Sequence, residues 1–301
     1  MSIETRQLRY FVAVAEELHF GRAAIRLNMT QPPLSQAIQS LEDVLGATLF
    51  HRTTRQISLT AAGHALLPEA KRLLQQIESL PALSQRAAAG DIGELKLAFV
   101  SIADYSVLPP SLQSFRQRHP QVKIELHEAT SDVQLQALEK ASIDVGLLIP
   151  PIPDHLCSII DYRRLRVEPL ILAIAEHRRK RKAATQLQTY KDLPIVLFPR
   201  KIAPAFHDRI LSCFQQRGLT PEISQEAIQM QTIIALVSAD MGIALVPQSV
   251  SNLKRPGVYY QNLSDIQAEV EIGVAWRKDN ESPVLKAFLN PSRSSGSHTN
   301  S

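Results

Sequence analysis

The spacing of apolar residues changes once along this chain, close to Gly90. Up to Ala89 the apolar residues recur every three or four positions, which is the period of one face of an α-helix. Beyond Gly90, short runs of Val, Ile and Leu alternate with helical stretches, an order typical of sheets covered by helices. The sequence therefore predicts a helix-rich N-terminal part followed by an α/β part with a parallel, helix-flanked sheet.

The composition narrows the class of protein. Of the 301 residues, 45% are hydrophobic and 21% are charged, which is the balance of a globular chain and not of a disordered one. No apolar run reaches the roughly 18 residues that span a bilayer, and the first twenty residues lack the apolar core of a signal peptide. We therefore expect a cytoplasmic protein without a membrane partner.

The residue patterns that usually carry catalysis or metal binding are missing. The nine histidines include no HxH or HExxH spacing, and the two cysteines, Cys157 and Cys213, stand far apart. The nucleotide-binding patterns GxGxxG and GxxxxGK[ST] and the hydrolase pattern GxSxG are also absent from the sequence. We expect no metal site, no bound cofactor and no enzymatic activity.

Three helices are expected within the first 46 residues. A short second helix covers residues 21–27. The third follows the capping residue Thr30, has Pro32 and Pro33 in its first turn, where their missing N–H groups cost nothing, and ends at Gly46. The first helix carries an apolar stripe made of Leu8, Phe11, Val12, Ala15 and Leu18.

The third helix has a polar face opposite its apolar stripe. Amides and hydroxyls both donate to and accept from base edges, whereas an ordinary solvated face more often carries Lys and Glu. A base-reading face and a plain exposed face both fit this helix alone, but the small residues Ala23 and Ala24 and the tight turn favour a helix-turn-helix. The stripe consists of Leu34, Ala37, Ile38, Leu41 and Leu45, and the polar face of Pro32, Ser35, Gln36 and Gln39.

Residues 49–60 form the pattern of a wing, with two short strands around a basic turn. In this position Arg52 and Arg55 are expected to reach phosphates or a minor groove beside the helix.

One long motif spans the helix-turn-helix and the wing. It reads Ala23-Ala24-x-x-Leu27-x-x-x-Gln31-Pro32-x-Leu34-Ser35-x-x-Ile38-x-x-Leu41-Glu42-x-x-Leu45-Gly46-x-x-Leu49-Phe50-x-Arg52, followed by Leu59-Thr60-x-Ala62-Gly63. This motif closely resembles LysR-type transcriptional regulators. The resemblance implies that Arg52 and Arg55 lie in the wing and that the major groove receives Gln31, Pro32, Pro33, Ser35, Gln36 and Gln39.

The resemblance also implies an assembly and partners. In this family a homodimer reads an interrupted palindrome in double-stranded promoter DNA, and two dimers form a homotetramer that bends the DNA. RNA polymerase is the expected protein partner of such an activator. Many family members carry arginine where this chain has Gln36, so a different base preference is expected at that contact.

The expected domain boundaries follow from the change of period and from the resemblance. They are residues 1–60 for the winged helix-turn-helix, 61–89 for a linker and dimerisation helix, 90–290 for an effector-binding domain and 291–301 for a disordered tail. By resemblance, the effector domain is of the periplasmic-binding-protein type (type 2). Its subdomain I holds residues 91–162 and 267–290, its subdomain II holds residues 163–266, and the effector lies between them.

The linker helix has an apolar repeat of about 3.5 residues, which indicates a seam between two helices. A helix packed against its own domain is the alternative. Pro68 and Pro81 interrupt the pattern, and Pro81 is expected to kink or end the helix. The seam consists of Leu66, Ala70, Leu73, Ile77 and Leu80.

The C-terminal ends of the predicted strands carry candidate effector contacts. Ligands of open α/β sheets bind at these ends, where helix N-termini favour anions. Ser101, Thr130 and Ser131 could donate to a carboxylate, although Ser and Thr are also ordinary helix caps. The apolar wall consists of Ile102, Ile149, Pro204 and Phe206, which suits an aromatic or unsaturated carboxylic acid.

The branch of the family that controls aromatic-compound breakdown has effector contacts at the positions of Ser131, Pro204 and Phe206. That branch can carry a hydroxyl where Ile102 stands and an arginine where Ile149 stands. A doubly charged, muconate-like effector therefore loses two of its partners here.

Two function classes are compared on this basis. The first is a DNA-binding transcriptional activator controlled by a small carboxylate, with aromatic acids and muconate-like compounds as candidates. The second is a small-molecule receptor whose N-terminal helices serve only oligomerisation. A glutamine-rich outward face and a wing with two arginines are not needed for oligomerisation, so the sequence favours the regulator.

Overall fold

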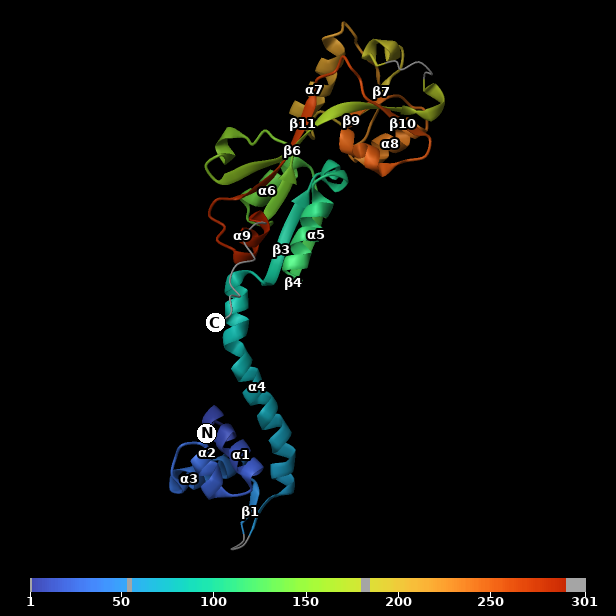
Figure 1. Ribbon diagram of the computed structural model, residues 1–301. Helices are drawn as coiled ribbons and strands as arrows, with labels where there is room; N and C mark the ends of the chain where they lie inside the picture. The colour runs from blue at the N-terminus through green and yellow to red at the C-terminus, as the bar shows by residue number, and fades with distance from the viewer. Residues whose placement is uncertain (1, 53–55, 180–184, 291–301) are drawn as a thin grey trace, which may run out of the picture. The chain divides into compact units, whose positions relative to one another are not determined.

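The computed structural model describes residues 2–52, 56–179 and 185–290 (Figure 1). The chain forms two compact units, Met1–Gln85 and Arg86–Ser301. The predicted wing residue Arg55 and the predicted disordered tail, residues 291–301, lie outside the described residues. None of the described helices is both long and apolar enough to cross a membrane.

The first unit is a winged helix-turn-helix, as the sequence predicts. The strands of the wing are antiparallel, and Phe50 pairs with Leu59. The elements are α1 (Thr5–Glu17), α2 (Phe20–Arg26), α3 (Gln31–Leu45), β1 (Phe50–Arg52) and β2 (Ile57–Leu59), and they are followed by the long helix α4 (Ala61–Ala89).

Two details of these helices differ from the prediction. Leu18 was expected in the apolar stripe of α1, but it ends the helix in a left-handed conformation (φ 47°) and is exposed. Thr30 does occupy the N-cap position of α3, but its side chain makes no capping hydrogen bond. The end of α3 agrees with the prediction, because Gly46 adopts a left-handed conformation (φ 64°) that costs glycine little.

Aromatic rings connect the wing to the helices. The rings of Phe11 in α1 and Phe50 in β1 lie 5.5 Å apart between centroids, and those of Phe20 in α2 and Phe50 lie 6.0 Å apart. Leu34 and Ile38 of α3 are fully buried in the same core. The orientation of α3 and the position of the wing therefore depend on one shared core.

The helix α4 continues through both prolines to Ala89, so the expectation that Pro81 could end it is wrong. A proline removes one helical hydrogen bond, and the other residues of this 29-residue helix maintain it. The first turns of α4 belong to the core of the first unit, where Ala70 is fully buried and Leu66 and Leu67 pack against it.

The second unit contains a seven-stranded sheet with helices on it. Its strand order is β10-β6-β11-β5-β3-β4, with β9 also paired to β6. Two further strands, β7 and β8, form a separate two-stranded sheet. The strands of the second unit are β3 (Ile92–Phe99), β4 (Gln121–Glu128), β5 (Val145–Leu148), β6 (Ile160–Ala175), β7 (Ile195–Leu197), β8 (Ile223–Glu226), β9 (Ala244–Pro247), β10 (Val258–Gln261) and β11 (Glu269–Arg277). The α-helices are α5 (Leu108–Arg118), α6 (Ser131–Glu139), α7 (Pro204–Gln215), α8 (Met230–Ser238) and α9 (Pro283–Leu289).

The prediction of a parallel sheet is only partly correct. β3 is parallel to β4 and β5, and β7 is parallel to β8. By contrast, β11 is antiparallel to β5 and β6, and β9 and β10 are antiparallel to β6. The reason is that the chain crosses between two parts of the unit twice, in one direction along β6 and in the opposite direction along β11.

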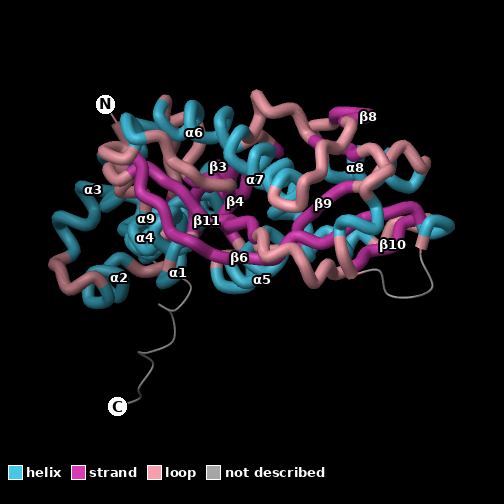
Figure 2. Tube along the Cα trace, turned by 90° about the horizontal axis from the view of Figure 1, so that it is seen from above, coloured by secondary structure: helices cyan, strands magenta, loops and turns pink. Residues whose placement is uncertain are grey.

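The strands β6 and β11 join two lobes (Figures 1 and 2). The first part of β6 pairs with β11 beside β5, β3 and β4, and its last part pairs with β9 and β10. The first lobe therefore holds β3–β5 with α5, α6 and α9, and the second holds β7–β10 with α7 and α8. Between them, Arg166 pairs with Ile272 and Arg164 with Gly273, which leaves Leu165 as a β-bulge in β6.

Candidate functional sites

The predicted polar face lies on the outside of α3. Gln31, Pro32, Pro33, Gln36 and Gln39 are exposed, while the neighbouring Ser35 is half-buried. The side chain of Gln39 is oriented by a hydrogen bond from its Nε2 to Oδ1 of Asp43, 3.1 Å away. The face is therefore accessible to a partner, and two of its members are held by neighbouring side chains.

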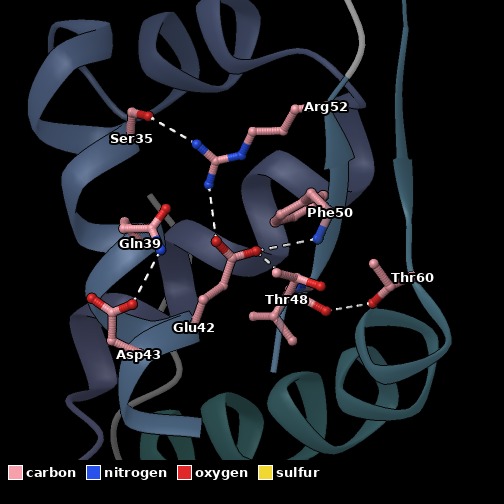
Figure 3. A network of polar contacts seen from close by, with 9 residues as sticks. Ser35, Gln39, Glu42, Asp43, Thr48, Phe50, Arg52 and Thr60 are labelled. Carbon is pink, nitrogen blue, oxygen red and sulfur yellow. Dashed lines mark hydrogen bonds and ion pairs between the residues drawn. The ribbon is translucent and has the colours of Figure 1, made fainter. Parts of the chain in front are cut away.

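A buried carboxylate holds the wing to α3 (Figure 3). Glu42 is only 4% exposed, and its Oε1 accepts hydrogen bonds from the backbone N–H of Leu49 at 2.7 Å and of Phe50 at 3.3 Å. Its Oε2 lies 3.1 Å from Nη2 of Arg52. A buried charge is tolerated only when it is paired and hydrogen-bonded, and here both carboxylate oxygens have partners.

Glu42 belongs to the family motif, but the sequence alone does not indicate its role. The available signal was an acidic residue directly beside the buried Leu41, on the inner side of an amphipathic helix. Its backbone partners lie seven and eight residues further along the chain, so the helical period alone does not reveal them.

Arg52 makes three contacts within the protein. Besides its ion pair with Glu42, its Nη1 donates to Oγ of Ser35 at 3.3 Å, and its guanidinium lies 5.0 Å from the ring centroid of Phe20. The predicted contact of Arg52 with a phosphate or a minor groove therefore remains a prediction. The structure adds a positioning role, since Arg52 joins α2, α3 and β1.

The contact with Arg52 also orients Ser35. Because Oγ of Ser35 accepts from Arg52, its hydroxyl hydrogen is free to be donated elsewhere. Ser35 is half-buried at the edge of the polar face, where its hydroxyl is partly accessible to solvent.

The predicted seam on α4 divides into a buried and an exposed part. Ala70 is fully buried in the core of its own unit, so its expected place in a dimer seam is wrong. Leu66 and Ile77 are half-buried, whereas Leu73 and Leu80 are 41% and 52% exposed. An apolar surface suitable for a second helix therefore begins at about Leu73.

The second unit contains a cavity of about 180 Å³ that gathers six of the seven predicted effector residues. Ser101 and Ile102 follow β3, Thr130 and Ser131 lie between β4 and α6, Ile149 follows β5, and Phe206 lies in α7. Pro204 does not line it but belongs to an adjoining cavity of about 400 Å³ that shares Ser131, Ile149 and Phe206.

The hydroxyl groups of this cavity are not used as helix caps. Oγ of Ser131 accepts from the backbone N–H of Ile149 at 3.0 Å, which leaves its own hydrogen available. Thr130 is the N-cap residue of α6, but its side chain makes no capping bond. Together with the free N–H groups of the first turn of α6, these hydroxyls offer donors to an anion.

The rest of the cavity wall is apolar. The rings of Phe198 and Phe206 are stacked, with centroids 5.0 Å apart and planes 24° apart. Ile102 and Phe206 are 3% and 5% exposed. Glu128 is the single ionisable residue in the described lining, which includes no Lys, Arg or His. A carboxylate here would be bound by dipoles and hydroxyls and not by an ion pair.

Several lining residues were missed by sequence reasoning. Gln229 and Met230 lie at the connection from β8 to α8, so the strand-to-helix argument used for Ser131 would have found them. Ile202 and Ala203 precede α7 and had no signal of their own.

Two known families match this chain. The family described as bacterial regulatory helix-turn-helix protein, lysR family, matches residues 5–64, and the LysR substrate binding domain matches residues 88–295. The HTH-type transcriptional regulator IlvR of Caulobacter vibrioides is 47% identical over 287 residues, which cover 95% of this chain and 96% of that protein. The HTH-type transcriptional regulator AlsR of Bacillus subtilis is 41% identical over 288 residues, which cover 95% of this chain and 94% of that protein.

Solved structures agree with these matches. The crystal structure of CbnR, a LysR family transcriptional regulator, is similar with a TM-score of 0.80 at 32% identity, covering 96% of this chain and 99% of that chain. Full-length CbnR in complex with its target DNA is similar with a TM-score of 0.82 at 32% identity, covering 97% of this chain and 99% of that chain.

We expect Glu42→Gln to lower the free energy of unfolding of the first unit by about 1–3 kcal/mol, because it weakens charge-assisted hydrogen bonds in a buried place. Urea denaturation followed by circular dichroism measures this change. Glu69→Gln is the matched control, since Glu69 is exposed and its described contact is with Arg72, and it should shift stability by less than about 0.5 kcal/mol. Equal shifts for the two variants would contradict the role given to Glu42.

Proposed function

Because the chain belongs to the LysR family of transcriptional regulators, we propose that it activates transcription when a small carboxylate binds in the cavity of its second unit. The protein is a LysR-type DNA-binding transcriptional regulator and not an enzyme. The alternative of a receptor without DNA binding is therefore set aside.

We propose that the polar face of α3 reads the major groove. The support is that this face is exposed and free of Lys and Glu, and that Arg52 leaves the hydroxyl hydrogen of Ser35 for an acceptor. Acceptors of this kind in the groove are N7 and O6 of guanine and O4 of thymine. Arg55 is proposed to contact the DNA backbone from the wing, as the family motif implies.

We propose that α4 forms the dimer and that two dimers form a homotetramer. The exposed side chains of Leu73 and Leu80 support this proposal. They are one heptad apart on α4, so a second helix would bury both, and burying apolar surface is favourable. RNA polymerase is the proposed partner of the bound activator.

The main support for this effector is the Ser131 hydroxyl, whose oxygen accepts from the N–H of Ile149, in the same cavity as the stacked rings of Phe198 and Phe206. A carboxylate fits the hydroxyls and N–H groups at the start of α6, and a flat apolar body fits Phe198, Phe206 and Ile102. We therefore propose a small aromatic or unsaturated monocarboxylate; a muconate-like dianion would lack a cation for its second charge among the described lining residues.

The DNA-reading proposal predicts that Gln36→Ala and Gln39→Ala each weaken specific binding by about 1–3 kcal/mol, which corresponds to roughly 5- to 150-fold, and relax base preference. Selection from a random DNA pool, followed by mobility-shift titration at several salt concentrations, measures both effects. Arg72→Ala on α4 should leave base preference unchanged. If the glutamine variants select the same sequences as the wild type, another surface reads the DNA.

The dimer proposal predicts that Leu80→Glu dissociates the assembly, because it places a charge in an apolar seam. Sedimentation equilibrium should show a mass that falls toward one chain. Gln75→Glu, at an exposed position of the same helix outside the stripe, should retain the mass of the wild type. A wild-type mass equal to one chain at micromolar concentration would refute the proposal.

The effector proposal predicts that benzoate binds and that Ser131→Ala weakens its binding by about 1–2 kcal/mol, or roughly 5- to 30-fold, because one hydrogen bond is lost. Phe206→Ala should weaken it further by removing an apolar wall. Calorimetry with benzoate and with muconate provides the measurement. The matched control is Ser142→Ala. Ser142 lies beyond the C-terminal end of α6, and its hydroxyl donates to the backbone oxygen of Ala137 in that helix. Unchanged binding in both cavity variants would rule out this site.

A further inference from the structure

A buried glutamine joins the strand ends behind one wall of the cavity. Gln134 lies in α6 and is fully buried. Its Nε2 donates to the backbone oxygen of Ala129 at 2.8 Å and to that of Leu147 at 3.2 Å. Ala129 directly follows β4, and Leu147 lies in β5. One side-chain amide therefore connects α6 to two neighbouring parts of the sheet.

The same strand ends are bonded to the residues that line the cavity. The backbone oxygen of Leu147 also accepts the N–H of Val100 at 2.9 Å, and the N–H of Ala129 donates to the oxygen of Phe99 at 3.0 Å. Val100 and Ala129 both line the cavity, whereas Gln134 does not. Gln134 thus contacts a junction of β3, β4 and β5 without reaching the ligand space itself.

Gln134 also bears on the position of Ser131, the main hydroxyl of the proposed effector site. The two residues are three positions apart in α6, which places them on one face of the helix. Oγ of Ser131 accepts from the N–H of Ile149 at 3.0 Å, two residues after Leu147. The start of α6 is therefore held to β5 and its continuation by two separate side chains.

The amide of Gln134 has one unpaired end. Its Oε1 is buried and has no hydrogen-bond partner among residues 2–52, 56–179 and 185–290. The orientation of the amide is still defined, because two carbonyl oxygens require the NH₂ group on the other side. A buried acceptor without a partner is unfavourable. The amide thus combines two hydrogen bonds with a cost, which makes its net effect on stability small.

The unpaired oxygen lies against Gly146 of β5. A Cβ atom at Gly146 would come within 2.7 Å of Oε1, which is closer than such atoms approach. Its other neighbours, in the side chains of Leu138 and Gln134, would lie at the ordinary distances of 3.6 and 3.7 Å. The glycine therefore leaves room for the Gln134 amide in this orientation, as glycines in strands do where another group approaches closely.

From these contacts we propose that Gln134 is a positioning residue of the effector cavity. Its amide fixes the ends of β4 and β5 against α6, and it thereby holds the Ser131 hydroxyl and the N–H groups of the first turn of α6 in the arrangement that receives a carboxylate. Gly146 belongs to the same arrangement because it leaves space for the amide. The proposal rests on the proposed function only in taking this cavity as the effector site.

Hydrogen exchange of the ligand-free, full-length protein tests this role. Gln134→Met keeps a side chain of similar length and removes the amide. Gly146→Ala keeps Gln134 but places a methyl group against Oε1, so the amide must move. Each variant should raise amide exchange at Val100, Ala129 and Ile149 by about three- to tenfold, as expected when the hydrogen bonds at this junction weaken.

The two substitutions act on the same interaction, so their combination is informative. The double variant should exchange no faster than the faster of the two single variants. The urea midpoint of Gln134→Met should stay close to that of the wild type, because removal of the unpaired oxygen offsets the two lost hydrogen bonds. Additive effects, an equal increase across the whole unit, or no increase at the three amides would each overturn the proposal.

Leu138→Met is the matched control. Leu138 is fully buried one turn further along α6, and the substitution introduces the same side chain without removing a polar atom. It should leave exchange at Val100, Ala129 and Ile149 unchanged. An increase equal to that of Gln134→Met would mean that the packing of α6, and not the amide, holds the strand ends, and it would also overturn the proposal.

Calorimetry with benzoate separates this role from the identity of the effector. If the wild type binds benzoate, Gln134→Met should weaken the binding by about three- to tenfold, while Leu138→Met should not change it. Benzoate binding that depends on Ser131 but is unaffected by Gln134→Met would refute the positioning role alone. Faster exchange at the three amides in a protein that binds no benzoate would refute the proposed effector and support the role of Gln134 in the cavity wall.

Discussion

The carboxylate of Glu42 holds the wing to α3 in the first unit. It receives two backbone N–H groups from the start of the wing and one guanidinium, and it lies in α3 itself. Through Arg52 the same carboxylate reaches Ser35 on the outer face and the ring of Phe20 in α2. A buried residue thus fixes the start of the wing against α3 and, through Arg52, is connected to a hydroxyl on the outer face of the helix.

The second unit has a related arrangement in β6, one of the two strands that join its lobes. The carboxylate of Glu168 in β6 is 2% exposed and accepts hydrogen bonds from the backbone N–H and the hydroxyl of Ser249, at 2.7 and 2.9 Å. Next to it, the bulge at Leu165 interrupts the pairing of β6 with β11. β6 is therefore held to the second lobe by the Glu168–Ser249 hydrogen bonds and carries a bulge between the lobes. Bulges of this kind bend a strand and allow its two halves to differ in direction.

Local patterns predicted much of this fold, and long-range pairings explain what they missed. The three helices, the wing and the strand-helix order follow from apolar spacing, and six of the seven predicted effector residues share one cavity because strand ends meet at one edge. The sequence alone does not reveal the first half of β6, because Arg163, Arg164 and Arg166 interrupt its apolar pattern and its partner β11 lies about a hundred residues later. The role of Glu42 was missed for the same reason, since its partners come near only after the chain has turned.

For the proposed carboxylate effector, the chemistry of the cavity would make the exclusion of water a condition for tight binding. Its described lining offers a carboxylate hydroxyls and N–H dipoles but no cation, and Glu128 adds a negative charge. Dipoles bind an anion strongly only where water is excluded, because the interaction between charge and dipole weakens as the local dielectric constant rises. A ligand bound in this way would favour any arrangement that encloses the cavity more completely, and by thermodynamic linkage such an arrangement would favour the ligand by the same factor.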